Sequence, residues 1–375
     1  MQEIGFWDYT CPGNGSLERY TRDDWEVLLD DMAAGGMNSF VLCVKWLTTG
    51  YRSQYAWLDQ DPAVTAIASD NALIHQALQG ARKRGIRTWL LVVGTQYHAP
   101  SFGIQPANPE AYWGEIGMYD LDQPGVAERI QLLYEEIVSL FGEETDGIVA
   151  ELEFCDGPGA HRIPLYEAWA AAEGRRSYEE ISRITLEPRS YPFLEWRDFT
   201  TERRIAMLKQ IEATVRGKGF FGPLTTLVEV GNCDGVLVRN VNLPRLRAGL
   251  PGWELVTYDS IYDRRINRLA TMDFCVERPR ALGFEVSWLT RGVMTFGANW
   301  SEIADSLHDQ WQMSLEDAQQ FQPDRLWFMG ADACMPDGMV CNSAKLPQWG
   351  YPDGRTARLA LMEMIREYAG VSSQR

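Results

Sequence analysis

The chain alternates strand-like and helix-like segments eight times, and this alternation limits what it can fold into. The strand-like segments are short and rich in Val, Leu and Ile, and a helical segment follows each of them. We expect strands at residues 4–10, 39–46, 86–93, 147–154, 224–230, 254–260, 282–288 and 325–330. Repeated strand–helix units require a parallel sheet covered by helices, and eight of them fit a closed (β/α)8 TIM barrel, an α/β fold.

The helices have recognisable start and stop signals. Thr21 is followed by Asp24 in the S/T-x-x-D pattern of a capping box, which predicts a helix that runs to Ala34 and ends at Gly35. Further helices are expected at residues 71–84, 126–141, 201–216, 244–248, 264–276, 301–321 and 356–368. The alternative is an open doubly wound sheet, but neither GxGxxG nor GxxxxGK follows the first strand.

We expect one domain, residues 1–375, because the sequence contains no linker and no internal repeat. An apolar content of 45% supports a core of that size. Residues 157–199 interrupt the pattern after the fourth strand, and they are too many for an ordinary connection in such a barrel. We therefore expect this insertion to wall the active site.

Charge and cysteine content exclude several functions. The net charge of −17 argues against nucleic acid and anionic membranes as partners, and it leaves neutral substrates open. Seven scattered cysteines without zinc spacing argue against a disulfide framework, which favours a reducing cytoplasm. No apolar run is long enough to cross a membrane. No cofactor is expected, and the oligomeric state stays open.

The fourth strand carries two carboxylates that a structural role does not require. Glu151 and Glu153 lie two residues apart between apolar residues, so alternation places them on one face. A buried acid costs free energy unless it is paired, and two close acids push one pKa upwards. A carboxylic acid that stays protonated at neutral pH is a general acid, so this strand indicates acid catalysis.

Active sites of such barrels lie where the strands end. This rule predicts a rim that is acidic and aromatic. Its expected substrate-binding residues are Asp8, Lys45, Trp46, Glu151, Glu229, Tyr258, Trp288, Trp327 and Asp332. Of four histidines only His98 falls on the rim, so we expect no metal site.

Paired carboxylates and rim aromatics are what cleavage of a glycosidic bond requires. One acid protonates the leaving oxygen, and a second carboxylate acts as nucleophile or base. We assign the first role to Glu153. Asp259 and Glu285 are the candidates for the second role, with Glu229 as a third, and the sequence leaves the choice open.

Residues Asp146–Glu153 resemble the DGxDxDxE signature on the fourth strand of family 18 chitinases. The resemblance implies that Glu153 is the acid and that Glu151 replaces the neighbouring aspartate, whereas Val149 replaces the first internal aspartate. Tyr258-Asp259 is similar to the Tyr-Asp pair on the sixth strand of that family. The resemblance implies a glycoside hydrolase barrel.

Two other segments resemble further barrel glycosidases. Residues 37–46, followed by Tyr51-Arg-Ser53, are similar to the second-strand region of α-L-fucosidases, without their His-His pair. Residues 195–199 resemble the segment after the insertion of barrel β-galactosidases, whose Asn-Glu pair is absent here. Together these resemblances imply a glycoside hydrolase without a single family.

The sequence thus predicts a barrel that hydrolyses a neutral oligosaccharide or glycoside. An insertion that makes the site a pocket favours exo-action on short substrates. Two alternatives stay open. The missing motif residues favour a carbohydrate-binding barrel without activity, and one barrel fold supports many chemistries, including a lyase or isomerase that uses Lys45 or Glu153 as a base.

Overall fold

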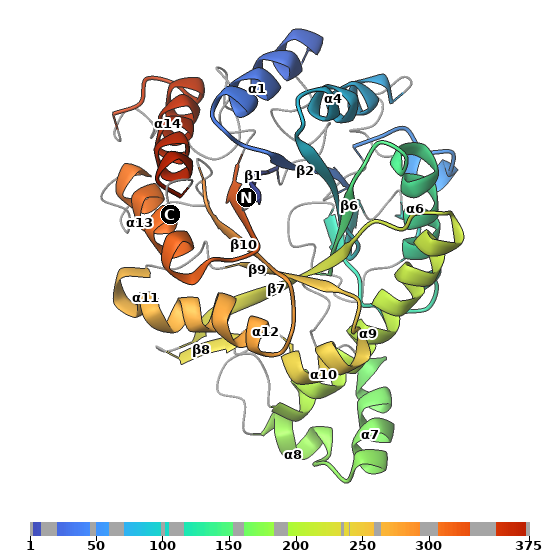
Figure 1. Cartoon of the computed structure of the whole chain (residues 1–375). Helices are drawn as coiled ribbons and strands as arrows, with labels where there is room; N and C mark the ends of the chain where they lie inside the picture. The colour runs from blue at the N-terminus through green and yellow to red at the C-terminus, as the bar shows by residue number, and fades with distance from the viewer. Residues whose placement is uncertain are drawn as a thin grey trace.

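The computed structural model describes residues 3–8, 21–45, 50–59, 71–98, 102–104, 116–152, 161–183, 194–233, 236–239, 241–258, 264–292, 307–330 and 350–372. Eight parallel strands form a closed barrel (Figure 1), which confirms the predicted fold class. They are β1 (Glu3–Trp7), β2 (Ser39–Lys45), β3 (Arg87–Val93), β6 (Gly147–Glu151), β7 (Leu224–Cys233), β9 (Glu254–Tyr258), β10 (Val286–Arg291) and β11 (Arg325–Met329). Each strand pairs with its neighbours along the chain, and β1 pairs with β11 to complete the ring.

Helices between consecutive strands cover the outside of the barrel (Figure 1). The principal ones are α1 (Arg22–Ala34), α4 (Ala72–Lys83), α6 (Val126–Phe141), α9 (Leu194–Gly217), α10 (Leu243–Gly249), α11 (Arg264–Met272), α13 (Leu307–Phe321) and α14 (Gly354–Ser372). The capping box at α1 is confirmed, because Thr21 accepts from Asp24 N and the Asp24 carboxylate accepts from Thr21 N. Among the described helices, none is both long enough and apolar enough to span a membrane.

Among the boundaries that differ from the predicted ones, the starts of β10 and α9 matter most for the site. The seventh barrel strand begins at Val286 rather than at residue 282, because Gly283 adopts a φ of +86° and turns the chain first. Helix α9 begins at Leu194 rather than at residue 201, so the insertion is more helical than expected. Two short antiparallel pairings were not predicted: β4 (Gln96–His98) with β5 (Ile116–Met118), and β8 (Val236–Arg239) with the end of β7.

Apolar side chains fill two separate layers. The larger layer lies between the strands and the helices, and the smaller one fills the barrel interior. Three tryptophans dominate the interior: Trp327 lies between Trp7 and Trp89, at ring-centroid distances of 5.6 and 5.4 Å. Such large rings fit only where the neighbouring strands provide space.

Glycine provides this space on β6. A Cβ atom at Gly147 would lie 2.3 Å from Cε3 of Trp89, which is far inside van der Waals contact. Gly147 and Trp89 are cross-strand neighbours in register, so the missing side chain of one accommodates the ring of the other. The smallest residue on β6 therefore permits the largest residue on β3.

The insertion after β6 has a small core of its own. It contains α7 (Arg162–Glu173), α8 (Tyr178–Ser182) and the start of α9. Tyr166 packs against Trp196 and Phe199, at centroid distances of 5.2 and 5.5 Å, and Trp169 and Tyr178 complete the cluster. In Figure 1, α7 and α8 lie beyond α10, outside the ring of barrel helices.

We expect Gly147→Ala to destabilise the protein by about 1–3 kcal/mol, because the added methyl group displaces the Trp89 ring inside a filled barrel. Chemical denaturation measures the change. Gly217→Ala is the matched control, since a Cβ atom there meets nothing within 4 Å. Equal stability of the two variants would contradict this account of the interior packing.

Candidate functional site

Polar side chains gather at the carboxyl ends of four barrel strands. Asp8 follows β1, Lys45 ends β2, Glu151 ends β6 and Tyr258 ends β9. Asp8, Lys45 and Glu151 are fully buried, and Tyr258 is 7% exposed. Because the strands are parallel, these four residues share one end of the barrel. The structure therefore brings together four of the residues that the sequence predicts for the site.

Burial of these charges costs free energy that an apolar barrel end would not require. The residues below them on the inner face are apolar: Val149 precedes Glu151, and Val256 precedes Tyr258. The pairing of β2 with β3 shifts between Cys43 and Lys45, which is a bulge-like irregularity. Such irregularities redirect side chains and are frequent next to active sites. This end of the barrel can therefore bind a polar ligand.

Several predicted site residues lie outside the described residues: Trp46, Glu153, Asp259 and Asp332. Glu229 lies within β7, where its backbone is in register with Tyr258. The chain before Glu153 is described up to Leu152, and it holds Glu151 at the end of β6. The roles assigned to these residues stay predictions.

Glu285 lies at the other end of the barrel. It precedes β10, its side chain is 64% exposed, and its Oε2 is 3.5 Å from Nη2 of Arg325 at the start of β11. We expected Glu285 to lie within a strand at residues 282–288, but β10 begins at Val286, and this later start places Glu285 at the amino end. The structure does not bring Glu285 together with Asp8, Lys45 and Glu151.

Trp288 and Trp327 were expected at strand ends, and both lie inside their strands instead. Trp288 packs with the outer layer between strands and helices. Trp327 is in the barrel interior, and its Nε1 donates to Ser39 Oγ at 3.0 Å. Both rings are fully buried in the core, so the structure offers neither as a platform for a sugar.

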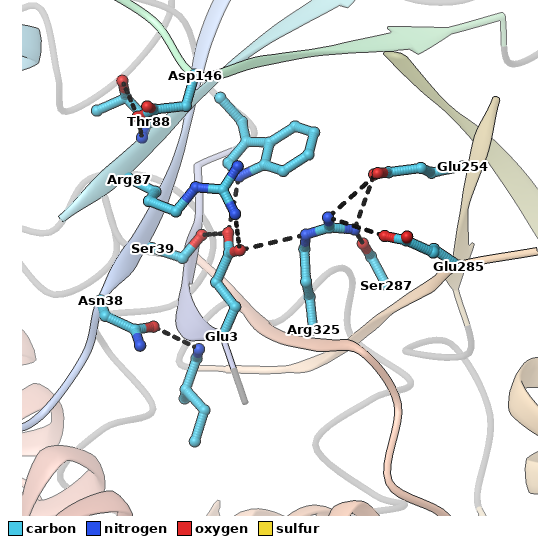
Figure 2. A network of polar contacts seen from close by, with 12 residues as sticks. Glu3, Asn38, Ser39, Arg87, Thr88, Asp146, Glu254, Glu285, Ser287 and Arg325 are labelled. Carbon is cyan, nitrogen blue, oxygen red and sulfur yellow. Dashed lines mark hydrogen bonds and ion pairs between the residues drawn. The ribbon is translucent and has the colours of Figure 1, made fainter. Parts of the chain in front are cut away.

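Figure 2 shows a network of charges that closes the amino end of the barrel and that the sequence analysis missed. Arg325 lies between two acids: its Nη1 is 2.8 Å from Glu254 and its Nε is 3.3 Å from Glu3. Glu3 also pairs with Arg87 at 2.8 Å and accepts from Trp89 Nε1 at 2.8 Å. Four of these charged residues, Glu3, Arg87, Glu254 and Arg325, are the first residues of their strands, which is a signal that the sequence contains.

Burial raises the pKa of Glu254 to about 7, although the Arg325 guanidinium opposes the shift. The neighbouring Glu285 carboxylate adds to the increase. Desolvation therefore exceeds the attraction of the ion pair at this position. The pKa of Glu254 is therefore raised by its burial in the ion-pair network at the amino end of the barrel, which is the end opposite the candidate site.

A second buried network lies beside the carboxyl end of β3, and we call it the Asp120–Arg162 network. Nε of Arg162 is 2.7 Å from Asp120 Oδ1 and 3.0 Å from Asp122 Oδ2. Asp122 also pairs with Arg203 Nε at 2.5 Å, and His161 Nε2 is 3.1 Å from Asp120 Oδ2. Burial raises the pKa of Asp120 to about 6, whereas Arg162 and His161 act to lower it. The Asp-Leu-Asp sequence before α6 was a signal that the sequence analysis did not use.

No group of three or more His, Cys, Asp or Glu side chains is arranged to hold a metal ion within the described part of the chain. The site is thus defined, as far as it is described, by carboxylates, one lysine and one tyrosine.

No protein-family model matches the chain, and no curated protein matches its sequence. Solved structures share its fold. The catalytic domain of β-amylase from Paenibacillus polymyxa has a TM-score of 0.59 at 10% identity, over 92% of this chain and 97% of that chain. A β-galactosidase from Marinomonas ef1 has a TM-score of 0.63 at 11% identity, over 99% of this chain and 60% of that chain.

A β-galactosidase from Halorubrum lacusprofundi has a TM-score of 0.63 at 13% identity, over 98% of this chain and 58% of that chain. The chain therefore spans about three fifths of the length of these two β-galactosidases. At such identities the similarity establishes the shared barrel fold.

The raised pKa of Glu254 predicts how stability depends on pH. Its contribution is fully present below the unfolded pKa of 4.5 and is lost as the pH rises through about 7. We expect the free energy of unfolding of the wild type, relative to Glu254→Gln, to fall between pH 4.5 and pH 8. Urea denaturation across this range measures it, with the exposed Glu179→Gln as control. A constant difference between wild type and Glu254→Gln would contradict the assignment.

Proposed function

We propose that the chain is a glycoside hydrolase that acts on a neutral oligosaccharide or glycoside, with Glu153 as general acid/base. The observation that carries the proposal is the burial of Asp8 and Glu151 at the carboxyl end of a barrel that known glycoside hydrolases share. Two separate strands deliver these acids to the end where barrel enzymes perform chemistry. Glu153 follows Glu151 by two residues in the sequence.

The proposed reaction requires two carboxylates. Glu153 donates a proton to the leaving glycosidic oxygen, and a second acid acts on the anomeric carbon as nucleophile or through a water molecule. Asp259 is our candidate for the second acid, because it follows Tyr258 at the carboxyl end of β9. Glu285 is not proposed for this role, since it precedes its strand.

The remaining polar groups suit a sugar. Lys45, Asp8 and Tyr258 can bind hydroxyl groups by hydrogen bonds, and a few such groups in a largely apolar surround are typical of ligand sites. The net charge of −17 favours a neutral substrate. We further propose exo-action on short substrates in a reducing cytoplasm. The odd number and wide scatter of the seven cysteines support that compartment.

One observation favours a second candidate function. Lys45 is fully buried at a strand end, and buried lysines serve as bases or as Schiff-base nucleophiles in other barrel chemistries. A lyase or isomerase would use Lys45 in this way. Its product would contain no added water, which separates it from a hydrolase.

We expect the wild type to release reducing sugar from members of a panel of aryl glycosides and short oligosaccharides. Glu153→Gln should lower kcat/KM by about 10²–10⁴-fold, because the amide cannot donate the proton. Aryl substrates with good leaving groups should lose less activity, since they need less protonation. Exo-action predicts a single small product from an oligosaccharide series, and a ladder of products would exclude it.

The control for this experiment is Glu179→Gln, which removes an exposed carboxylate on α8 that pairs only locally with Arg183. It should keep wild-type activity. Full activity of Glu153→Gln would refute the acid assignment, and Asp259→Asn would then be compared. Sugar binding without turnover by the wild type would support the carbohydrate-binding alternative instead.

A further inference from the structure

The Asp120–Arg162 network joins three segments that are distant in the chain. Asp120 and Asp122 precede α6, Arg162 begins α7, and Arg203 lies within α9. The Arg162 side chain is fully buried, and those of Asp120 and Asp122 are nearly so. A buried ion network is costly to break on one side, because the remaining charge loses its partner. These three segments are therefore held in one fixed arrangement.

Backbone hydrogen bonds connect this arrangement to the end of β6. Gly94 N donates to Glu151 O at 2.9 Å, and Tyr119 N donates to Thr95 O at 2.9 Å. Thr95 follows Gly94, and Asp120 follows Tyr119, so Asp120 is linked through two short steps to Glu151. The end of β3 and the end of β6 thus share one hydrogen-bonded unit with the network.

Arg162 completes the link from the other side. It follows Glu151 by only eleven positions in the chain. Glu151 at the end of β6 is therefore attached to β3, and Arg162 at the start of α7 is attached to Asp120 and Asp122. The hydrogen bond between Tyr119 and Thr95 joins these two attachments.

The insertion does not need this attachment for its own cohesion. Its aromatic core packs α7 and α8 against α9. Arg176 adds two hydrogen bonds to Glu195 at 2.8 and 2.9 Å, which tie the end of α7 to the start of α9. The Asp120–Arg162 network is different, because it fastens α7 to the chain beside β3 and β6.

We propose that Arg162 is a positioning residue for the β6 end of the site: its ion pairs with Asp120 and Asp122 hold the start of α7 in place beside the ends of β3 and β6. The inference rests on the proposed glycosidase function. Arginine suits the role because its planar guanidinium can meet two carboxylates at once, whereas a lysine ammonium is a single point charge. Cζ of Arg162 also lies 5.9 Å from the centroid of the Phe199 ring, and this contact joins Arg162 to the core of the insertion.

The test compares Arg162→Met and Arg162→Lys with Arg176→Met, which removes the ion pair between Arg176 and Glu195 inside the insertion. We expect kcat of Arg162→Met to fall by about 10–100-fold with KM nearly unchanged, since small misplacement of a catalytic group has an effect of this size. Arg162→Lys should recover part of kcat. Arg176→Met should lower Tm and leave kcat unchanged.

Unchanged kcat in folded Arg162→Met, or an equal loss in Arg176→Met, would overturn the inference. If Arg162→Met does not fold, the single variants Asp122→Asn and Arg162→Lys replace it in the test. Each must then lower kcat and leave KM nearly unchanged.

Hydrogen exchange separates this inference from the proposed function. If the wild type cleaves no glycoside, the function fails, and the positioning role is decided by the exchange of amides at the ends of β3 and β6. Faster exchange at Gly94 and Leu152 in Arg162→Met than in Arg176→Met supports the role. Equal exchange in the two variants overturns it.

Discussion

Filling of the barrel interior is the constraint on which the rest of this structure depends. Eight strands enclose a space that side chains must fill, and here three tryptophans are the largest side chains that fill it. Trp89 requires the bare backbone of Gly147, and Trp327 lies between the other two rings. Two of these rings form hydrogen bonds at the amino end of the barrel. Nε1 of Trp89 donates to Glu3, and Nε1 of Trp327 donates to Ser39. These hydrogen bonds connect the tryptophan packing to the charged network at the amino end.

The two ends of the barrel use charge in different ways. At the amino end Arg325 stacks over Trp89, with its Cζ 4.6 Å from the ring centroid, and compensates Glu3 and Glu254. At this end each described charged residue lies next to a residue of opposite charge, so ion pairs close the amino end of the barrel. At the carboxyl end the buried Asp8, Lys45 and Glu151 lie on separate strands, above the tryptophan layer. A barrel whose amino end is closed by ion pairs and whose carboxyl end holds buried polar groups is suited to bind a ligand at the carboxyl end only.

The regular parts of the fold could be predicted from the sequence because their causes are local. Helix α6 was predicted to the residue, since Gly125 and Gly142 bound an amphipathic run. The start of β10 was missed because Leu282 and Phe284 look like strand residues, and only the positive φ of Gly283 separates them from the strand. The positions of Glu151 and Lys45 at strand ends could be predicted from the sequence alone. The partners of Arg162 could not, because Asp120 and Asp122 are 42 and 40 positions away and meet it only through the barrel.

The small core of the insertion has a consequence for folding. Barrel closure requires β6 to pair with β7, although more than seventy residues separate Glu151 from Leu224. The entropy lost on closing a loop grows with the length of flexible chain between its ends. Tyr166 is 30 and 33 positions from Trp196 and Phe199, less than half the separation of Glu151 and Leu224, so these contacts can form before the barrel closes. A compact insertion shortens the flexible path between the two strands, so the segment that interrupts the barrel in sequence also assists its assembly.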